Sequence, residues 1–201
     1  MSDSHIVNRL RVDDTIYTID NTDPLGFDYD LEEKDFLEYP SIMLLANVLN
    51  SRGMAQETRE NFEQAKRDYN KAIEINPEYA NAYNNRGNIK AKQADYKGAI
   101  MDYNRAIELN SQFVEAYCNR GIAKENLGDH SEASKDFDRA IELNSEYIDG
   151  YLRRAMLRQD SGDYAGAIRD FDRVIEIEPE SKDRMIGYKE RAVRLQKGAE
   201  T

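Results

Sequence analysis

The sequence has little cysteine and histidine, and it has no long apolar run. Its single cysteine, Cys118, excludes an intramolecular disulfide framework and a cysteine-ligated zinc cluster. Its two histidines, His5 and His130, are far apart in the sequence and do not indicate a metal site. No stretch approaches the roughly eighteen apolar residues of a membrane-spanning helix, and residues 1–5 lack the basic and apolar blocks of a secretory signal. We therefore expect a cytoplasmic protein with no membrane partner, no metal and no other cofactor.

Basic residues are too few for a protein that binds a phosphate backbone. The chain has 28 Lys and Arg against 39 Asp and Glu, a formal net charge of −11. Because a nucleic-acid-binding protein needs a basic face, nucleic acid is not an expected partner. Hydrophobic residues make up 40% of the 201 residues and charged residues 33%, which favours one or two folded domains over a disordered tail.

A repeat of 34 residues is the strongest pattern in the chain. Tyr83-Asn84-Asn85-Arg86-Gly87 returns 34 residues later as Tyr117-Cys118-Asn119-Arg120-Gly121. Alanine and aromatic positions keep the same period: Ala65, Ala99, Ala133 and Ala167, then Tyr69, Tyr103, Phe137 and Phe171. The period defines four consecutive units, 46–79, 80–113, 114–147 and 148–181.

Each unit predicts two helices joined by a short turn. In the second unit, the spacing of apolar residues predicts helices over about 82–94 and 97–109. Glycine marks this turn in two units, and proline follows the second helix in two, since the residue before a proline resists the helical conformation. These residues are Gly128, Gly162, Pro77 and Pro179.

The units resemble the tetratricopeptide repeat (TPR). The resemblance covers 136 of the 201 residues and rests on the aromatic residues and on small residues where two helices approach closely. It implies an all-α fold, a right-handed solenoid of four helix-turn-helix repeats. Counted from the first residue of each unit, the seventh position departs from the family's leucine and the eleventh from its tyrosine. The seventh is arginine in all four units, and the eleventh is Gln56, Lys90, Lys124 or Arg158.

An aspartate stands 16 residues after each seventh-position arginine. A buried arginine needs its charge matched, so we predict an ion pair between the two helices of each repeat, with the guanidinium fork on the carboxylate. The alternative is two solvated charges that contribute little. The predicted pairs are Arg52 with Asp68, Arg86 with Asp102, Arg120 with Asp136, and Arg154 with Asp170.

The two ends of the chain differ from the repeats. Residues 1–40 form an irregular acidic N-terminal arm with 11 acidic and 3 basic residues, and a short helix is predicted near 30–38. Residues 9–12 and 15–19 form either a weak hairpin or part of a mobile arm. The TPR domain is expected over 41–197, with its first helix starting near Pro40.

A C-terminal capping helix is predicted at about 182–197, and it should cover the fourth repeat. Its apolar face would consist of Met185, Tyr188, Ala192 and Leu195. Residues 182–201 contain six basic and three acidic residues, so the ends carry opposite charge. Self-association of two chains through the acidic arm and this basic helix is therefore a hypothesis.

The resemblance implies that the first helices line a concave groove, into which positions 2, 5, 6, 9, 12 and 13 point. Asparagine side chains donate and accept hydrogen bonds, so at these positions they suit the backbone of an extended peptide. Apolar residues at the ninth position suit its side chains. The alternative for the asparagines is bonding to neighbouring helices. The candidate groove residues are Asn50, Met54, Asn84, Asn85, Asn88, Asn119, Ile122, Arg153 and Met156.

These features favour binding over catalysis. No nucleophile–base set, glycine-rich phosphate loop or metal-ligand spacing appears, so no residue is a candidate catalyst. The first interpretation is a protein-protein interaction scaffold or adaptor that binds an extended peptide segment or a partner helix in the groove. The alternative is a dedicated chaperone whose acidic arm occupies the groove until a client displaces it.

The resemblance extends to co-chaperones whose TPR domains hold a peptide's C-terminal carboxylate. Asn88, Asn119 and Arg153 match that carboxylate clamp, whereas Asn84 and Asp149 stand where it has lysines. Since Asp149 would repel a carboxylate, the clamp is the less favoured interpretation.

Overall fold

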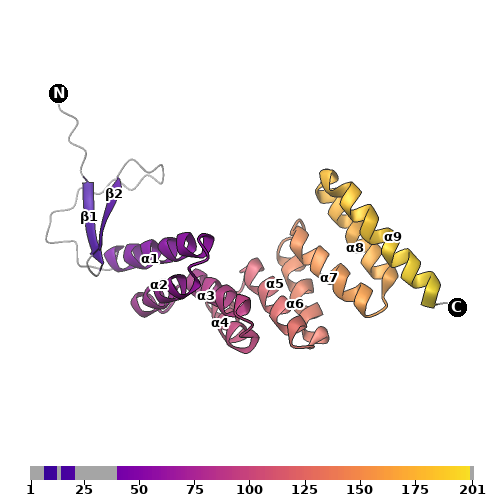
Figure 1. Ribbon diagram of the computed structural model, residues 1–201, viewed down its shortest axis with the longest axis horizontal. Helices are drawn as coiled ribbons and strands as arrows, with labels where there is room; N and C mark the ends of the chain where they lie inside the picture. The colour runs from indigo at the N-terminus through magenta and orange to yellow at the C-terminus, as the bar shows by residue number, and fades with distance from the viewer. Residues whose placement is uncertain (1–6, 13–14, 21–39, 200–201) are drawn as a thin grey trace, which may run out of the picture. The chain divides into compact units, whose positions relative to one another are not determined.

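The computed structural model describes residues 7–12, 15–20 and 40–199 (Figure 1). The chain divides into two compact units, Met1–Glu38 and Tyr39–Thr201. In the first unit, β1 (Val7–Val12) pairs with the antiparallel β2 (Thr15–Asp20), and Val12 lies opposite Thr15. The hairpin interpretation is therefore confirmed. The helix predicted near 30–38 lies outside the described residues.

The second unit consists of helical hairpins in series, followed by one more helix (Figure 1). The first helices of the repeats are α1 (Pro40–Thr58), α3 (Ala80–Lys92), α5 (Val114–Asn126) and α7 (Ile148–Asp160). The second helices are α2 (Phe62–Ile75), α4 (Tyr96–Leu109), α6 (His130–Leu143) and α8 (Tyr164–Ile177). A 3₁₀ turn, η1 (Pro179–Ser181), leads into α9 (Lys182–Ala199).

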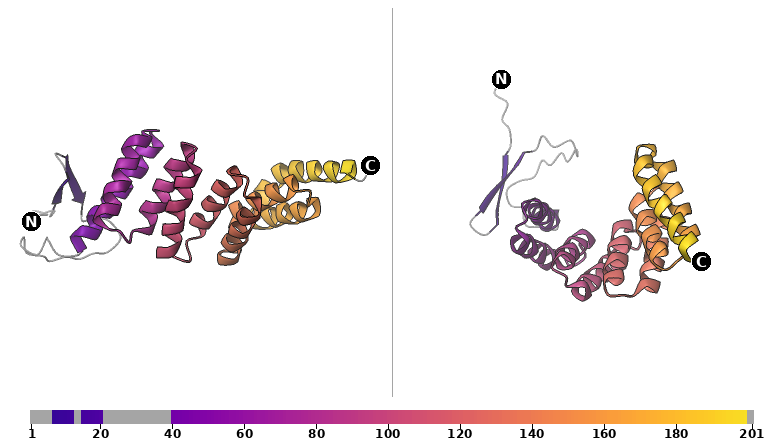
Figure 2. Two further views of the ribbon diagram at one scale, coloured as in Figure 1. Left: turned by 90° about the horizontal axis from the view of Figure 1, so that it is seen from below. Right: turned by 45° about the vertical axis from the view of Figure 1, so that its right-hand side comes forward.

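The first helices lie closer to one another than the second helices do. Each helix contacts the next one in sequence, and α1 also contacts α3, α3 contacts α5, and α5 contacts α7. Among the described helices, neighbouring second helices make no comparable contact. Figure 2 shows the hairpins following one another along this stack. The first helices therefore form the inner side of the stack, which we call the first-helix face.

One aromatic ring fills the space between the two helices of each repeat. Tyr69, Tyr103, Phe137 and Phe171 are buried, as are the four alanines that precede them by four residues. In three repeats a glycine of the first helix lies against this ring. A Cβ atom on Gly121 would lie 2.6 Å from Cε1 of Phe137, and Ala155 takes this position in the fourth repeat. The small residues of the repeat thus permit the close approach of its two helices.

The last helix covers the fourth repeat with most of its predicted apolar face. Met185 and Ala192 are fully buried, and the ring of Tyr188 stacks on Phe171 with centroids 5.4 Å apart. The prediction was wrong for Leu195, which is 41% exposed. Since α9 has 18 residues and the antiparallel α8 has 14, the last turn of α9 extends past the start of α8.

The turns inside the repeats differ in their use of glycine. Gly128 and Gly162 adopt φ values of +83° and +86°, whereas Glu60 and Ala94 adopt φ of +60°. A side chain in this left-handed conformation costs roughly 1–2 kcal/mol, and the greater chain entropy of unfolded glycine offsets part of that cost.

We expect Ala94→Gly to raise the free energy of unfolding by about 0.5–1 kcal/mol, because it relieves this strain. The matched change Gly128→Ala should lower it by about 1 kcal/mol. Urea denaturation followed by circular dichroism measures both values. Changes of the same sign in the two variants would contradict this explanation.

Candidate functional site

An arginine and an aspartate join the two helices of every repeat. In the third repeat, Nε and Nη2 of Arg120 donate to the two carboxylate oxygens of Asp136 at 2.9 and 2.6 Å. The same bidentate contact joins Arg52 with Asp68, Arg86 with Asp102, and Arg154 with Asp170. All four aspartates are buried. The 16-residue spacing therefore places an ion pair, and not two solvated charges, between the helices of each repeat.

The eleventh position supplies a second cation to three of these aspartates. The ammonium groups of Lys90 and Lys124 lie 2.8 Å from Asp102 and Asp136, respectively. Arg158 donates to Asp170 at 2.7 Å. Sequence reasoning missed this contact. The cation recurs in three units, always 12 residues before the aspartate, and that recurrence was the signal that could have revealed it.

The same arginines also join neighbouring repeats. The Nη1 atoms of three arginines donate to a side-chain oxygen on the second helix of the preceding repeat. The pairs are Arg86 with Asn70 at 2.8 Å, Arg120 with Asn104 at 2.7 Å and Arg154 with Asp138 at 2.5 Å. On α9, Lys189 contacts Asp172 in the corresponding place. A series of polar contacts thus runs from the first repeat to the last helix.

A ladder of side-chain amides crosses the first-helix face. Nδ2 of Asn119 donates to Oδ1 of Asn84 at 3.1 Å, and Nδ2 of Asn85 donates to Oδ1 of Asn50 at 3.0 Å. Asn84 donates to Asn85 at 3.4 Å and thereby connects the two contacts. At its end, Asn50 donates to Sδ of Met54 at 3.7 Å. Asn85 and Asn119 therefore do bond to neighbouring helices.

The ladder divides its asparagines into supporting and accessible residues. Asn50 and Asn84 are 5% and 6% exposed, whereas Asn85 and Asn119 are partly exposed. A side-chain amide has two N–H donors and an oxygen with two lone pairs. The bonds within the ladder therefore orient Asn85 and Asn119 and leave each of them further hydrogen-bonding capacity.

The other candidate groove residues lie around the ladder. Met54 is exposed, and Ile122 and Met156 are partly exposed. Asn88 accepts a hydrogen bond from the Tyr103 hydroxyl at 2.9 Å. Burial raises the pKa of Tyr103, so this hydroxyl keeps the proton that it donates. Arg153 is exposed on α7.

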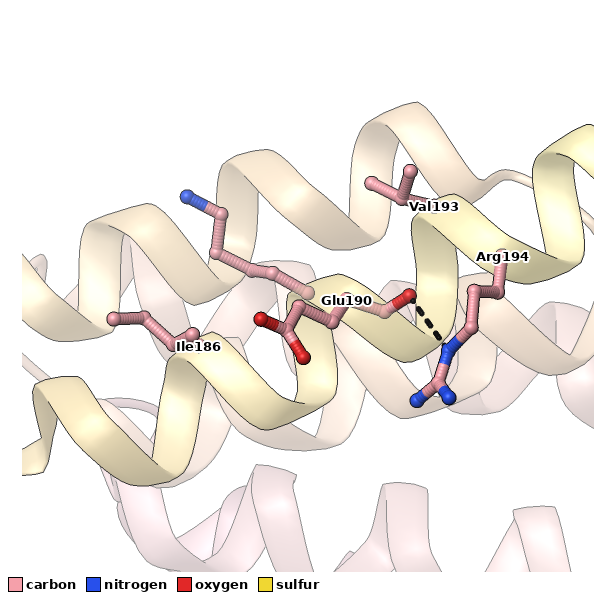
Figure 3. A pocket seen from close by; sticks show the side chains of 5 residues that line it. Ile186, Glu190, Val193 and Arg194 are labelled. Atoms are coloured by element: carbon pink, nitrogen blue, oxygen red, sulfur yellow. Dashed lines mark hydrogen bonds between the residues drawn. The ribbon is translucent and has the colours of Figure 1, made fainter.

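The helix α9 carries a shallow hollow of about 490 Å³ (Figure 3). Ile186 and Val193 supply its apolar part, and Lys189, Glu190 and Arg194 supply its polar part. If the 34-residue register is continued, Ile186, Glu190, Val193 and Arg194 take positions 5, 9, 12 and 13 of a fifth unit. In this register α9 takes the place of a first helix, and it packs against α8.

The described part of the chain offers little for metal or thiol chemistry. No group of three or more His, Cys, Asp and Glu residues in it could hold a metal ion. Within the same residues, no helix is both long and apolar enough to cross a membrane. Cys118 is buried, and burial raises the pKa of its thiol to about 12, so the thiol stays protonated at neutral pH.

Paired helices in series, with small and aromatic residues at a fixed period, define a helical-hairpin repeat protein. Family models described as TPR repeat or tetratricopeptide repeat match residues 46–79, 68–101, 87–128, 114–147 and 148–181. Three of these ranges have the same bounds as the units found in the sequence. The chain belongs to the tetratricopeptide repeat family.

Solved structures share this fold. A crystal structure of MamA protein is 23% identical, with a TM-score of 0.64, and the match covers 77% of this chain and 86% of that one. The first TPR of Spaghetti (RPAP3), bound to the HSP90 peptide SRMEEVD, is 25% identical with a TM-score of 0.57 over 59% and 94% of the two chains. YrrB, described as a TPR protein with an unusual peptide-binding site, is 23% identical with a TM-score of 0.57 over 71% and 76%. None of the curated proteins matches the sequence.

Proposed function

We propose that this protein is a non-catalytic, cytoplasmic scaffold or adaptor that binds an extended peptide segment or a helix of a partner protein along its first-helix face. The amide ladder is the observation that carries the proposal, because it holds Asn85 and Asn119 in a fixed orientation on this face. The similar domain of Spaghetti (RPAP3) was solved with a peptide bound, which supports peptide binding as the general activity.

The ladder suits a ligand's backbone, and the residues around it suit the ligand's side chains. An extended peptide presents N–H and C=O groups in alternation, and an amide can bond to either. Asn50 and Asn84 are buried, so their proposed role is to position Asn85 and Asn119 and not to contact the ligand. Met54, Ile122 and Met156 offer apolar contacts, with methionine adapting to different shapes.

Binding of a C-terminal carboxylate is the less favoured version of this function. The clamp pattern would require lysines at Asn84 and Asp149. Asn84 is buried and bonded within the ladder, and the exposed Asp149 carries the wrong charge. We therefore expect weak binding of acidic C-terminal peptides by this chain.

The test is binding of the full chain to an array of random 12-residue peptides. We expect Asn85→Ala combined with Asn119→Ala to weaken binding about thirtyfold, because each change removes a hydrogen-bonding pair that contributes about 1 kcal/mol. Asn61→Ala is the matched control, since this exposed asparagine lies in the turn before α2. Equal binding by the double variant and the wild type, with circular dichroism spectra unchanged, would contradict the proposal.

A dedicated chaperone is the second candidate function. In that version the acidic arm occupies the groove until a client displaces it. Residues 21–39 of that arm, which the hypothesis of self-association between two chains also involves, lie outside the described residues. A scaffold should hold a folded partner at a stoichiometric ratio. A chaperone should instead suppress the aggregation of a client and then release it.

A further inference from the structure

The contacts of α9 place it one residue later in the repeat than an uninterrupted count does. The arginine at position 7 of a first helix bonds to position 25 of the preceding second helix, and on α9 it is Lys189 that makes this contact, with Asp172. Met185 then takes position 3 and Ala192 position 10, and both are fully buried. In α3, α5 and α7 these positions are buried too, and position 10 packs with residues of the preceding second helix. The α9 helix therefore packs on α8 as a first helix packs on the hairpin before it.

The second helix of a repeat covers one side of its first helix, at positions 8 and 11. In the third repeat, Gly121 at position 8 lies against the ring of Phe137. Lys124 at position 11 and the arginine at position 7 both contact the carboxylate of Asp136. A second helix therefore brings an apolar surface and a buried carboxylate to this side of a first helix.

The corresponding side of α9 is exposed. Ile186, Glu190 and Val193 take positions 4, 8 and 11, and they line the hollow of about 490 Å³ together with Lys189 and Arg194 (Figure 3). Ile186 and Val193 are each 38% exposed. The α9 helix contacts α8 and η1, but all five residues of the hollow belong to α9 itself. Within the described part of the chain, these five residues thus form an uncovered surface, which we call the open side of α9.

Two cations on the open side lack the carboxylate that a second helix provides. From the second repeat on, the arginine at position 7 bonds both to the preceding repeat and to an aspartate of its own second helix. Lys189 makes the first contact, and no carboxylate among the described residues takes the place of the second. In the same part of the chain, Arg194 forms one hydrogen bond, from Nε to the backbone oxygen of Glu190 at 3.4 Å. An acidic side chain of a covering helix therefore has two cations with which to pair.

Glu190 limits which helix can cover the open side. It stands at position 8, where the repeats have glycine or alanine. An aromatic ring at the facing place would bury the Glu190 carboxylate without a partner, which is unfavourable. The second helices of this chain carry such a ring directly after the aspartate, at Tyr69, Tyr103, Phe137 and Phe171. A second helix from another copy of this chain therefore does not fit, whereas a helix with a small or basic residue at this place does.

We propose that the open side of α9 binds an amphipathic helix of a partner protein, antiparallel to α9, in the place of a second helix. The partner helix carries apolar residues at i and i+7 for Ile186 and Val193, as second helices carry their small residues at positions 20 and 27. It carries an acidic residue at i+3 for Lys189 and Arg194, and a small or basic residue at i+4 beside Glu190. This surface is distinct from the first-helix face, so one molecule can hold two partner segments.

A library of helical peptides of about 18 residues tests this proposal with the full chain. All peptides share an alanine-rich sequence and differ at i, i+3, i+4 and i+7. We expect the bound peptides to have Leu, Ile or Met at i and i+7 and Asp or Glu at i+3. Ile186→Gln combined with Val193→Gln should weaken their binding about thirtyfold, because the apolar contacts are lost. Leu195→Gln is the matched control and should leave binding unchanged, since Leu195 is 41% exposed on α9 but lies outside the hollow.

A charge reversal tests the acidic preference at i+3. Arg194→Glu should lower the enrichment of Asp and Glu over Lys and Arg at this position about tenfold, because one of the two cations becomes an anion. The preference at i and i+7 should persist, since Ile186 and Val193 are unchanged. An unaltered preference at i+3 would overturn the assigned pairing.

The outcomes separate this surface from the first-helix face. Peptides whose binding falls with Asn85→Ala combined with Asn119→Ala, and not with the α9 double variant, overturn this proposal and leave the proposed function standing. A library from which the wild type binds no helix also overturns it. If light scattering shows a dimer of the wild type that Val193→Gln dissociates, a second copy covers the open side and the partner helix is overturned.

Discussion

The free energy of unfolding of the Asp136→Ala variant is expected to be about 3–5 kcal/mol lower than that of the wild type. The change leaves Arg120 and Lys124 partly buried without the carboxylate that both contact. Such a loss is large for one residue, since whole domains are stable by only about 5–15 kcal/mol. Urea denaturation followed by circular dichroism measures it.

An exposed ion pair of similar length provides the control. Arg139 and Glu142 lie 3.0 Å apart, but the Glu142 side chain is 64% exposed, whereas that of Asp136 is 5% exposed. Glu142→Ala should therefore change the free energy of unfolding by less than about 1 kcal/mol. A double-mutant cycle of Arg120→Met and Asp136→Asn should give a coupling of about 2 kcal/mol. Coupling indistinguishable from zero would contradict a stabilising role of the pair.

The variant Gly121→Ala is expected to lower the free energy of unfolding by about 1–3 kcal/mol. Its new methyl group would lie 2.6 Å from the buried ring of Phe137, which has no room to move away. Phe137→Ala alone should cost about 3–5 kcal/mol, because it leaves a cavity. In that background, adding Gly121→Ala should cost less than it does in the wild type, because the clashing ring is absent.

A second glycine of the same chain separates crowding from helix propensity. Gly187 lies inside α9, and a Cβ atom there would meet nothing within 4 Å. Gly187→Ala should therefore raise the free energy of unfolding by up to about 1 kcal/mol, as alanine favours a helix more than glycine does. The same urea titrations measure all of these variants. Equal costs of Gly121→Ala with and without the Phe137 ring would rule out the proposed clash.

The sequence predicted the repeats well because insertions do not interrupt their period. Helix ends were less accurate. The first helix of the second unit was expected to reach Ala94, but α3 ends at Lys92 because Ala94 itself adopts the left-handed conformation. No glycine marks this turn, so the sequence carries no local signal for it.

The contacts between repeats were harder to predict than those within a repeat. The Arg–Asp pairs recur at one spacing inside each unit and so are visible in the sequence. The amide ladder joins residues 35 positions apart, one more than the repeat length, as in Asn84 with Asn119. An alignment at the 34-residue period never places such residues in the same column. Their proximity depends on how one hairpin is rotated against the next, which only the structure provides.

The arginines that bond to two neighbouring repeats couple the stability of each helical hairpin to that of the hairpin before it. When one hairpin opens, the guanidinium of the following repeat loses its bond to the opened second helix, as Arg120 would lose Asn104. In a linear array, the free energies of such contacts between neighbouring repeats decide whether the repeats unfold one at a time or together. Here every internal boundary carries a charge-assisted link in addition to its apolar contact. The array should therefore lose its structure within a narrow range of denaturant and keep its helices aligned until then.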